Sequence, residues 1–99
     1  MKVENMTSNK GNKIANQFII VEEGHGALGN FSKRETFQSY DSIIAIKTIW
    51  ADKTEIKLDC KTWDYSITTG KYRNRFLGID KKETLKQIKE GKIILANLN

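Results

Sequence analysis

Residues 43–59, IIAIKTIWADKTEIKLD, decide the fold of this chain. Isoleucine recurs through residues 43–49 and the run ends at Trp50, a composition typical of a β-strand. Residues 55–59, EIKLD, alternate strictly between polar and apolar side chains, which predicts a second strand with one buried face. The intervening Asp-Lys pair predicts a tight turn. The whole stretch therefore predicts an antiparallel hairpin.

Two further strands are predicted upstream of this hairpin. Residues 17–21, QFIIV, form a β-branched and aromatic run, and residues 36–40, TFQSY, alternate between apolar and polar side chains. The glycine-rich residues 24–30 connect them and are expected to be mobile. Residues 1–12 are polar, and we expect them to be flexible. The first half of the chain thus predicts an antiparallel meander with one face that needs a cover.

The C-terminal third is expected to supply that cover. A short helix is predicted to begin at Asp80, whose side chain can cap it, and to end at Gly91. Leu85 and Ile88 supply its apolar stripe. Residues 93–95 are expected to add a final strand or to pack as an extended tail.

Residues 69–77 are compatible with two structures. As a helix, the segment has a cap in Thr68, a hydrophobic staple between Ile67 and Tyr72, and an end at Gly78. As a strand, its three cations would share one face. The helix is favoured because the staple and the glycine both fit. The sequence therefore predicts one α+β domain over residues 1–99, an antiparallel β-meander of about four strands covered on one face by one or two short C-terminal helices.

The excess positive charge of the chain lies in its C-terminal part. Residues 1–60 carry 8 Lys and Arg against 8 Asp and Glu, whereas residues 61–99 carry 9 against 4. The second segment also opens with the densest run of aromatic and basic residues. A one-sided cationic surface with interleaved rings attracts a polyanion and can hold it. We therefore expect the partner to be nucleic acid, or a protein with an acidic or nucleic-acid-binding surface.

Two groups of residues in this segment are candidates for the binding surface. The first combines cations with rings that can stack on an unpaired base, and the second is a lysine stripe along the helix that follows residue 80. Rings in a small domain are more often core residues, and a lysine stripe is often only a solvated helix face. The candidates are Trp63, Lys71, Tyr72, Arg73 and Arg75 in the first group, and Lys82, Lys86 and Lys89 in the second.

Three motifs resemble known catalytic or ligand-binding sites, but none of them is a strong candidate. Residues 24–29, GHGALG, have the spacing of a dinucleotide loop, but no helical pattern follows them. Asp41 followed by residues 55–57, EIK, has the skeleton of a metal-dependent nuclease, although such alternation is common on the solvent face of a strand. His25 and Cys60 lack partners at zinc-binding spacing. We expect a non-enzymatic protein with no catalytic residue, metal or cofactor, and rank a nuclease last.

The cysteine content and the hydropathy of the chain predict that the protein is cytoplasmic. Cys60 is the single cysteine, so an internal disulfide is impossible and a reducing compartment is expected. We expect this side chain to be partly buried. The apolar runs are too short for a membrane-spanning helix, and residues 1–8 lack the apolar core of a signal peptide. No membrane partner is expected.

The run W-D-Y-S-x-T-T-x-K-Y-R-N-x-F-L over residues 63–77 resembles a small domain family of unknown function. The family is associated with bacteriophages, plasmids and other mobile elements of Firmicutes. Residues 37–40 and 43–45 also resemble it, whereas residues 22–34 form a longer loop than that family suggests. The resemblance implies a mobile-element protein that acts in the cytoplasm of a bacterial host. It brings no established activity and therefore no catalytic residue.

Two classes of function remain open after these observations. The first is an accessory protein that binds nucleic acid through the basic, aromatic-rich C-terminal third. The second is a protein–protein inhibitor of a host defence system, of the anti-CRISPR or anti-restriction type. The salt dependence of nucleic-acid binding distinguishes the two.

Overall fold

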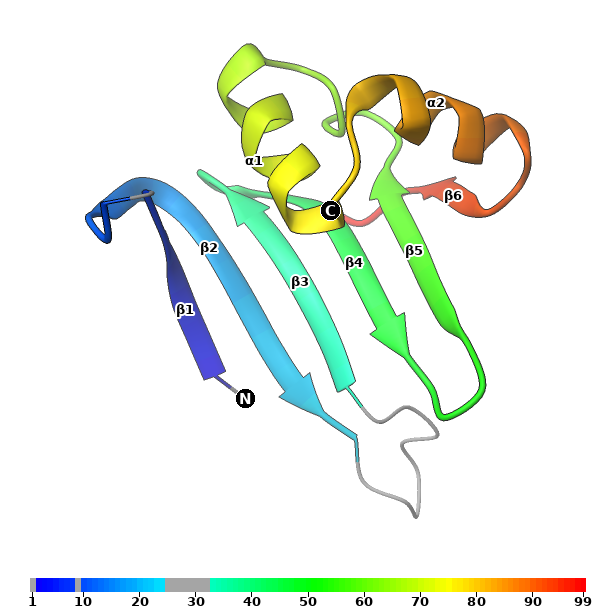
Figure 1. Cartoon of the computed structure of the whole chain (residues 1–99), viewed down its shortest axis with the longest axis horizontal. Coiled ribbons are helices and arrows are strands. Elements are labelled where there is room, and N and C mark those ends of the chain that lie inside the picture. Colours follow the sequence, from blue (N-terminus) through cyan, green and yellow to red (C-terminus); the bar gives the residue numbers. More distant parts are fainter. Residues whose placement is uncertain (1, 9, 25–32) are drawn as a thin grey trace.

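The computed structural model describes residues 2–8, 10–24 and 33–99. It contains a six-stranded sheet and two helices (Figure 1). The strands lie in the sheet in the order of the sequence, and each is antiparallel to its neighbour except the last, which runs parallel to the fifth. The elements are β1 Lys2–Thr7, β2 Lys13–Glu23, β3 Lys33–Ser39, β4 Ser42–Ile49, β5 Thr54–Asp59, α1 Ile67–Leu77, α2 Lys81–Lys89 and β6 Ile93–Ala96.

The predicted hairpin is confirmed as β4 and β5. Ala45 pairs with Leu58 and Ile49 with Thr54, so the isoleucine-rich run and the alternating run form one ladder. Ala45 and Leu58 are both fully buried, as the alternation requires. A bulge in β4, opposite Phe37, interrupts the register with β3, and Ile44 is fully buried there as well. The α+β class is confirmed, whereas the sheet has six strands instead of about four.

Residues 2–7 form strand β1, within the segment 1–12 that we expected to be flexible. In β1, Val3 pairs with Ile20 and Asn5 with Phe18 along the edge of the sheet. Met6 is only 6% exposed and belongs to the hydrophobic core. Its burial explains how such a polar segment is held against the rest of the sheet. β2 is also longer than the predicted residues 17–21, since Lys13 pairs with β1 at one end and residues 22–23 pair with β3 at the other. The glycine-rich residues 24–30, with the dinucleotide-like spacing and His25, lie almost wholly outside the described residues.

The two helices begin and end at capping residues. Ser66 caps α1 by accepting a hydrogen bond from the Thr69 N–H, and Gly78 ends it with a φ of 76°. The cap is thus Ser66 and not Thr68. The predicted staple is also wrong, because Ile67 is 94% exposed. Asp80 caps α2 by accepting from the Glu83 N–H, as predicted.

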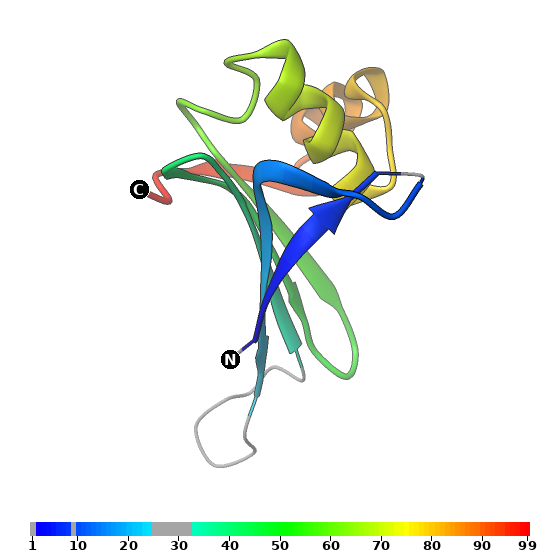
Figure 2. The same cartoon turned by 90° about the vertical axis from the view of Figure 1, so that its left-hand side faces the viewer.

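Both helices lie on the same face of the sheet, across one end of it (Figures 1 and 2). The chain leaves β5, forms α1 and α2, and returns as β6 beside β5, which gives the predicted final strand. The rings of Phe37 in β3 and Phe76 in α1 stack with centroids 5.7 Å apart. This contact places α1 over β3 and fixes the face that α1 presents to β1 and β2. No helix in the described part of the chain is long and apolar enough to cross a membrane.

Candidate functional site

A basic groove lies between α1 and the turn that connects β1 to β2. It has a volume of about 430 Å³. Two segments that are far apart in the sequence form its walls, and six residues line it: Ser8, Lys10, Ile14, Lys71, Tyr72 and Arg75. We call this feature the basic groove. It combines three cations with an aromatic ring, and none of its described lining residues is acidic.

Local backbone structure positions each wall of the basic groove. In the β1–β2 turn, the Ser8 hydroxyl oxygen accepts hydrogen bonds from the Lys10 and Asn12 N–H groups, at 3.3 and 3.2 Å. Gly11 adopts a φ of 83°, which favours glycine and lets the chain reverse there. In α1, Lys71 and Arg75 are four residues apart and therefore lie on the same side of the helix.

The cations of the basic groove have no ion-pair partner among the described residues. Seven ion pairs occur in that part of the chain, and none involves Lys10, Lys71 or Arg75. Two like charges one helical turn apart destabilise an isolated helix by a few tenths of a kcal/mol. The helix therefore carries an uncompensated repulsion that a bound anion can relieve.

Tyr72 places an aromatic ring in the basic groove. Its side chain is half-buried and packs against the hydrophobic core. The ammonium group of Lys71 lies 5.5 Å from the ring centroid, within the range of a cation–π contact. The ring is thus held by the core and associated with a cation at the groove.

Arg75 lies between the basic groove and a second hollow. That hollow is lined by residues of β1 to β4 and of α1, and includes Glu4 and Glu35. Both carboxylates already have lysine partners, because Lys2 lies 3.1 Å from Glu4 and Lys33 lies 3.6 Å from Glu35. The positive charge of Arg75 therefore remains available to the basic groove.

Arg73 does not belong to an exposed binding surface, which corrects the sequence-based expectation. Its side chain is only 1% exposed, and Nη1 donates to the Trp63 carbonyl oxygen at 2.7 Å and to Asp64 Oδ1 at 3.2 Å. Nη2 donates to Asn74 Oδ1 at 2.8 Å. The guanidinium also stacks over the Trp63 ring, 5.1 Å from its centroid. Arg73 is therefore a structural residue, and Trp63 is its partner away from the basic groove.

Asp64 connects the two helices through two cations. Its other oxygen, Oδ2, lies 2.7 Å from the ammonium of Lys81, the first residue of α2. The hydrogen bond from Lys81 is the main cause that lowers the pKa of Asp64; burial opposes this effect and Arg73 adds to it. This carboxylate stays ionised and holds α1 and α2 together.

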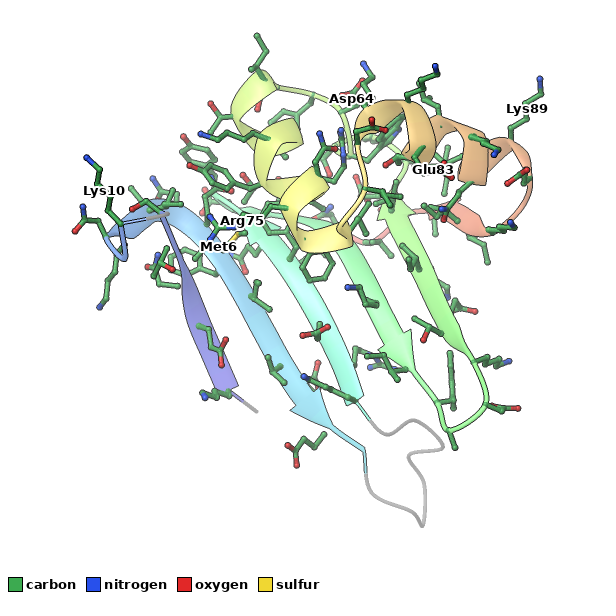
Figure 3. All side chains as sticks on the ribbon, viewed as in Figure 1. Met6, Lys10, Asp64, Arg75, Glu83 and Lys89 are labelled. Carbon is green, nitrogen blue, oxygen red and sulfur yellow. The ribbon has the colours of Figure 1, made fainter. Side chains whose placement is uncertain are left out.

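The three candidate lysines of α2, namely Lys82, Lys86 and Lys89, lie apart from the basic groove. Lys82 and Lys86 line a separate hollow together with Asp80 and Glu83. Figure 3 shows Lys89 at the far end of α2, on the opposite side of the molecule from Arg75 and Lys10. The candidate lysines of α2 therefore do not extend the basic surface of α1. Lys71, Tyr72 and Arg75 come together, whereas Trp63, Arg73 and the three candidate lysines of α2 lie elsewhere.

The residues of the nuclease motif lie at opposite ends of β4. Asp41 precedes this strand, whereas Glu55 pairs with Thr48 near its other end, about 23 Å away at the usual rise per residue. Glu55 and Lys57 form an ion pair at 3.6 Å. Among the described residues, no group of three or more histidine, cysteine or acidic side chains is placed to hold a metal ion.

Cys60 is exposed and not partly buried, which corrects the expectation from the sequence.

Three residues of the basic groove were missed by the sequence analysis, namely Ser8, Lys10 and Ile14. They lie in or next to a turn more than fifty residues upstream of α1. The only signal in the sequence is the Ser-x-Lys-Gly pattern of residues 8–11, which is typical of a turn but says nothing about its distant neighbour.

Comparison with known proteins gives a family but no function. No curated protein and no solved structure matches the chain. The model of a family of unknown function, DUF8033, matches residues 1–93. This match agrees with the uncharacterised domain family that the sequence resembled. Because the match spans nearly the whole chain, the protein belongs to the DUF8033 family.

Proposed function

We propose that this protein is a non-enzymatic accessory protein that binds nucleic acid through the basic groove. Its setting would be a bacteriophage or other mobile element, in the cytoplasm of a bacterial host. That setting rests on the resemblance of residues 63–77 to proteins of such elements.

The observation that carries this proposal is the set of cations around Tyr72 that have no ion-pair partner in the described part of the chain. Lys10, Lys71 and Arg75 line one groove without an acidic side chain among the six lining residues. Phosphate oxygens fit such a cluster, because each cation can donate to a phosphate and release a condensed counterion. An aromatic ring beside phosphate-binding cations can stack on a base.

The number of cations in the basic groove determines the expected salt dependence of binding. Three phosphate contacts predict a slope of about −2 to −3 in a plot of log K against log salt concentration. We therefore expect binding that tightens at low salt and weakens steeply toward physiological salt. Such an electrostatic term is independent of sequence.

Fluorescence anisotropy with labelled oligonucleotides over a series of salt concentrations tests the proposal. The double variant Lys71→Gln/Arg75→Gln should lower the affinity and reduce the salt slope by about two. The matched control is Lys82→Gln/Lys86→Gln, which removes the same charge from α2, away from the basic groove. If both variants weaken binding equally, net charge alone explains the binding and the groove assignment is wrong.

A protein–protein inhibitor of a host defence system is the second candidate function. The supporting observation is an open hollow at the start of α1, where Tyr65 and Ile67 are 49% and 94% exposed beside Lys71 and Lys81. Exposed apolar side chains next to cations suit a partner protein with acidic side chains. A host protein that is retained after nuclease treatment of the lysate, lost on Ile67→Ser and kept by Arg75→Gln would favour this function, because Arg75 lines the basic groove but not this hollow.

A further inference from the structure

We propose that the basic groove accepts an unpaired nucleotide, so that the ligand is single-stranded nucleic acid whose base stacks on Tyr72. This inference rests on the proposed nucleic-acid function and specifies the class of ligand. It follows from the position of the ring relative to the cations.

The Tyr72 ring is half-buried within the groove. The β1–β2 turn contributes one wall through Ser8 and Lys10, and α1 contributes the other. A double helix can bring its phosphates to the cations, but its bases are already stacked and paired. Taking one base out of a duplex costs a few kcal/mol. An unpaired base pays no such cost and can enter beside the ring.

The cation–π contact indicates where that base would stack. The ammonium of Lys71 lies over the Tyr72 ring, 5.5 Å from its centroid, and Lys71 is an exposed residue. A base that stacks on this face takes the place of the ammonium. The flexible lysine side chain can then move to the adjoining phosphate, where it meets a full negative charge.

The basic groove has few groups that could distinguish one base from another. Its hydrogen-bonding side chains are three cations, which only donate, and the hydroxyl groups of Ser8 and Tyr72. The Ser8 hydroxyl oxygen already accepts from two backbone N–H groups of its own turn. Ile14 adds an aliphatic surface to the wall. We therefore expect recognition of the base by its face, with little preference for sequence.

Matched single-stranded and duplex oligonucleotides of the same sequence test this inference. At equal salt, the protein should bind the single strand at least about tenfold more tightly than the duplex. Tyr72→Leu keeps an apolar side chain against the core and should lower single-strand affinity about tenfold, with little effect on duplex affinity. Tyr72→Phe keeps the ring and should bind within about twofold of wild type. DNA and RNA strands are compared in parallel, since a preference for RNA would indicate a contact to the 2′-hydroxyl.

Photochemical cross-linking gives a second readout that does not depend on a stable Tyr72 variant. A single strand that carries 5-iodouracil, irradiated in complex with the wild-type protein, should form its adduct at Tyr72, as located by peptide mass spectrometry. Equal affinity for single strand and duplex, or adducts only elsewhere, would overturn the single-strand inference. If that equal affinity still depends on Lys71 and Arg75, the proposed function stands. If neither nucleic acid binds at low salt, both proposals fail.

Discussion

Asp64 Oδ1 lies 3.2 Å from Nη1 of Arg73, and this arginine side chain is only 1% exposed. An arginine in a basic run of sequence is thus a buried structural residue. Its guanidinium holds the loop before α1 to the body of the helix through Asp64 and the Trp63 carbonyl. The positive charge of α1 that can reach a ligand in the basic groove therefore comes from Lys71 and Arg75.

Replacement of Arg73 should destabilise the fold. Arg73→Met leaves the Trp63 carbonyl without this donor and removes one of two cations from Asp64, and we expect a loss of about 3 kcal/mol of unfolding free energy. Arg75→Met makes the same change at an exposed position of the same helix and should stay within about 0.5 kcal/mol of wild type. Urea denaturation measures both variants. Equal stability of the two would mean that the buried ion pair contributes little.

Acid should weaken the fold through Asp59. This carboxylate is 2% exposed, and burial alone would raise its pKa. Hydrogen bonds from the Leu98 N–H, the Thr62 hydroxyl, the Asn99 side chain and the Lys61 N–H outweigh burial and lower the pKa from 3.8 to about 2. Because the unfolded chain binds this proton more tightly, the carboxylate stabilises the fold above about pH 4, and that contribution is lost as the pH falls toward 2.

The loss amounts to about 2 kcal/mol, the free-energy equivalent of the pKa difference. Urea denaturation of wild type and Asp59→Asn at a series of pH values measures it. The wild type should be more stable at neutral pH, and the difference should shrink by about 2 kcal/mol between about pH 5 and pH 2. A difference that does not change with pH would show that Asp59 titrates normally.

The N-terminal strand should contribute to stability through Met6. Met6→Ala removes a core side chain and should cost about 2–5 kcal/mol of unfolding free energy. Val3→Ala, in the same strand but at a position that is 58% exposed, should cost less than about 0.5 kcal/mol. Thermal or urea denaturation compares them. If Met6→Ala is as mild as Val3→Ala, the N-terminal segment does not belong to the folded core.

The parts of the fold that the sequence predicted are those with local patterns. The β4–β5 hairpin follows from alternation around a turn, and α2 follows from its cap at Asp80. β1 has no such pattern, because it lies at the edge of the sheet and buries only Met6. Its existence depends on pairing with β2, and a non-local contact of this kind leaves little trace in the sequence of the strand itself.

The candidate site was predictable only in part, for a related reason. Residue type and charge indicated Lys71, Tyr72 and Arg75, but these features are the same for an exposed cation and a buried one. Arg73 is buried because Asp64 and the Trp63 carbonyl fold back onto α1. Lys10 faces α1 because the β1–β2 turn is placed there by the sheet. The burial of Arg73 and the position of Lys10 both depend on tertiary structure. Neither produces a periodic pattern in the sequence.

Lys10 provides the sharpest test of the basic groove, because it lies outside the basic C-terminal third. Lys10→Gln should weaken nucleic-acid binding and reduce the salt slope by about one, as expected for one lost phosphate contact. Lys13→Gln is the matched control, since Lys13 is exposed in the same hairpin but does not line the groove. Stability should be unchanged in both, because neither lysine has an ion-pair partner among the described residues.

The two variants have equal net charge, so a difference between them reports position rather than charge. Anisotropy titrations at several salt concentrations should show a reduced slope for Lys10→Gln alone. If Lys13→Gln reduces the salt slope equally, binding depends on the overall charge of the hairpin. The position of Lys10 in the wall of the basic groove then does not matter. If neither variant changes the slope, the β1–β2 turn does not contact the ligand. In that case binding would rest on the basic C-terminal third, as the charge distribution of the sequence first indicated.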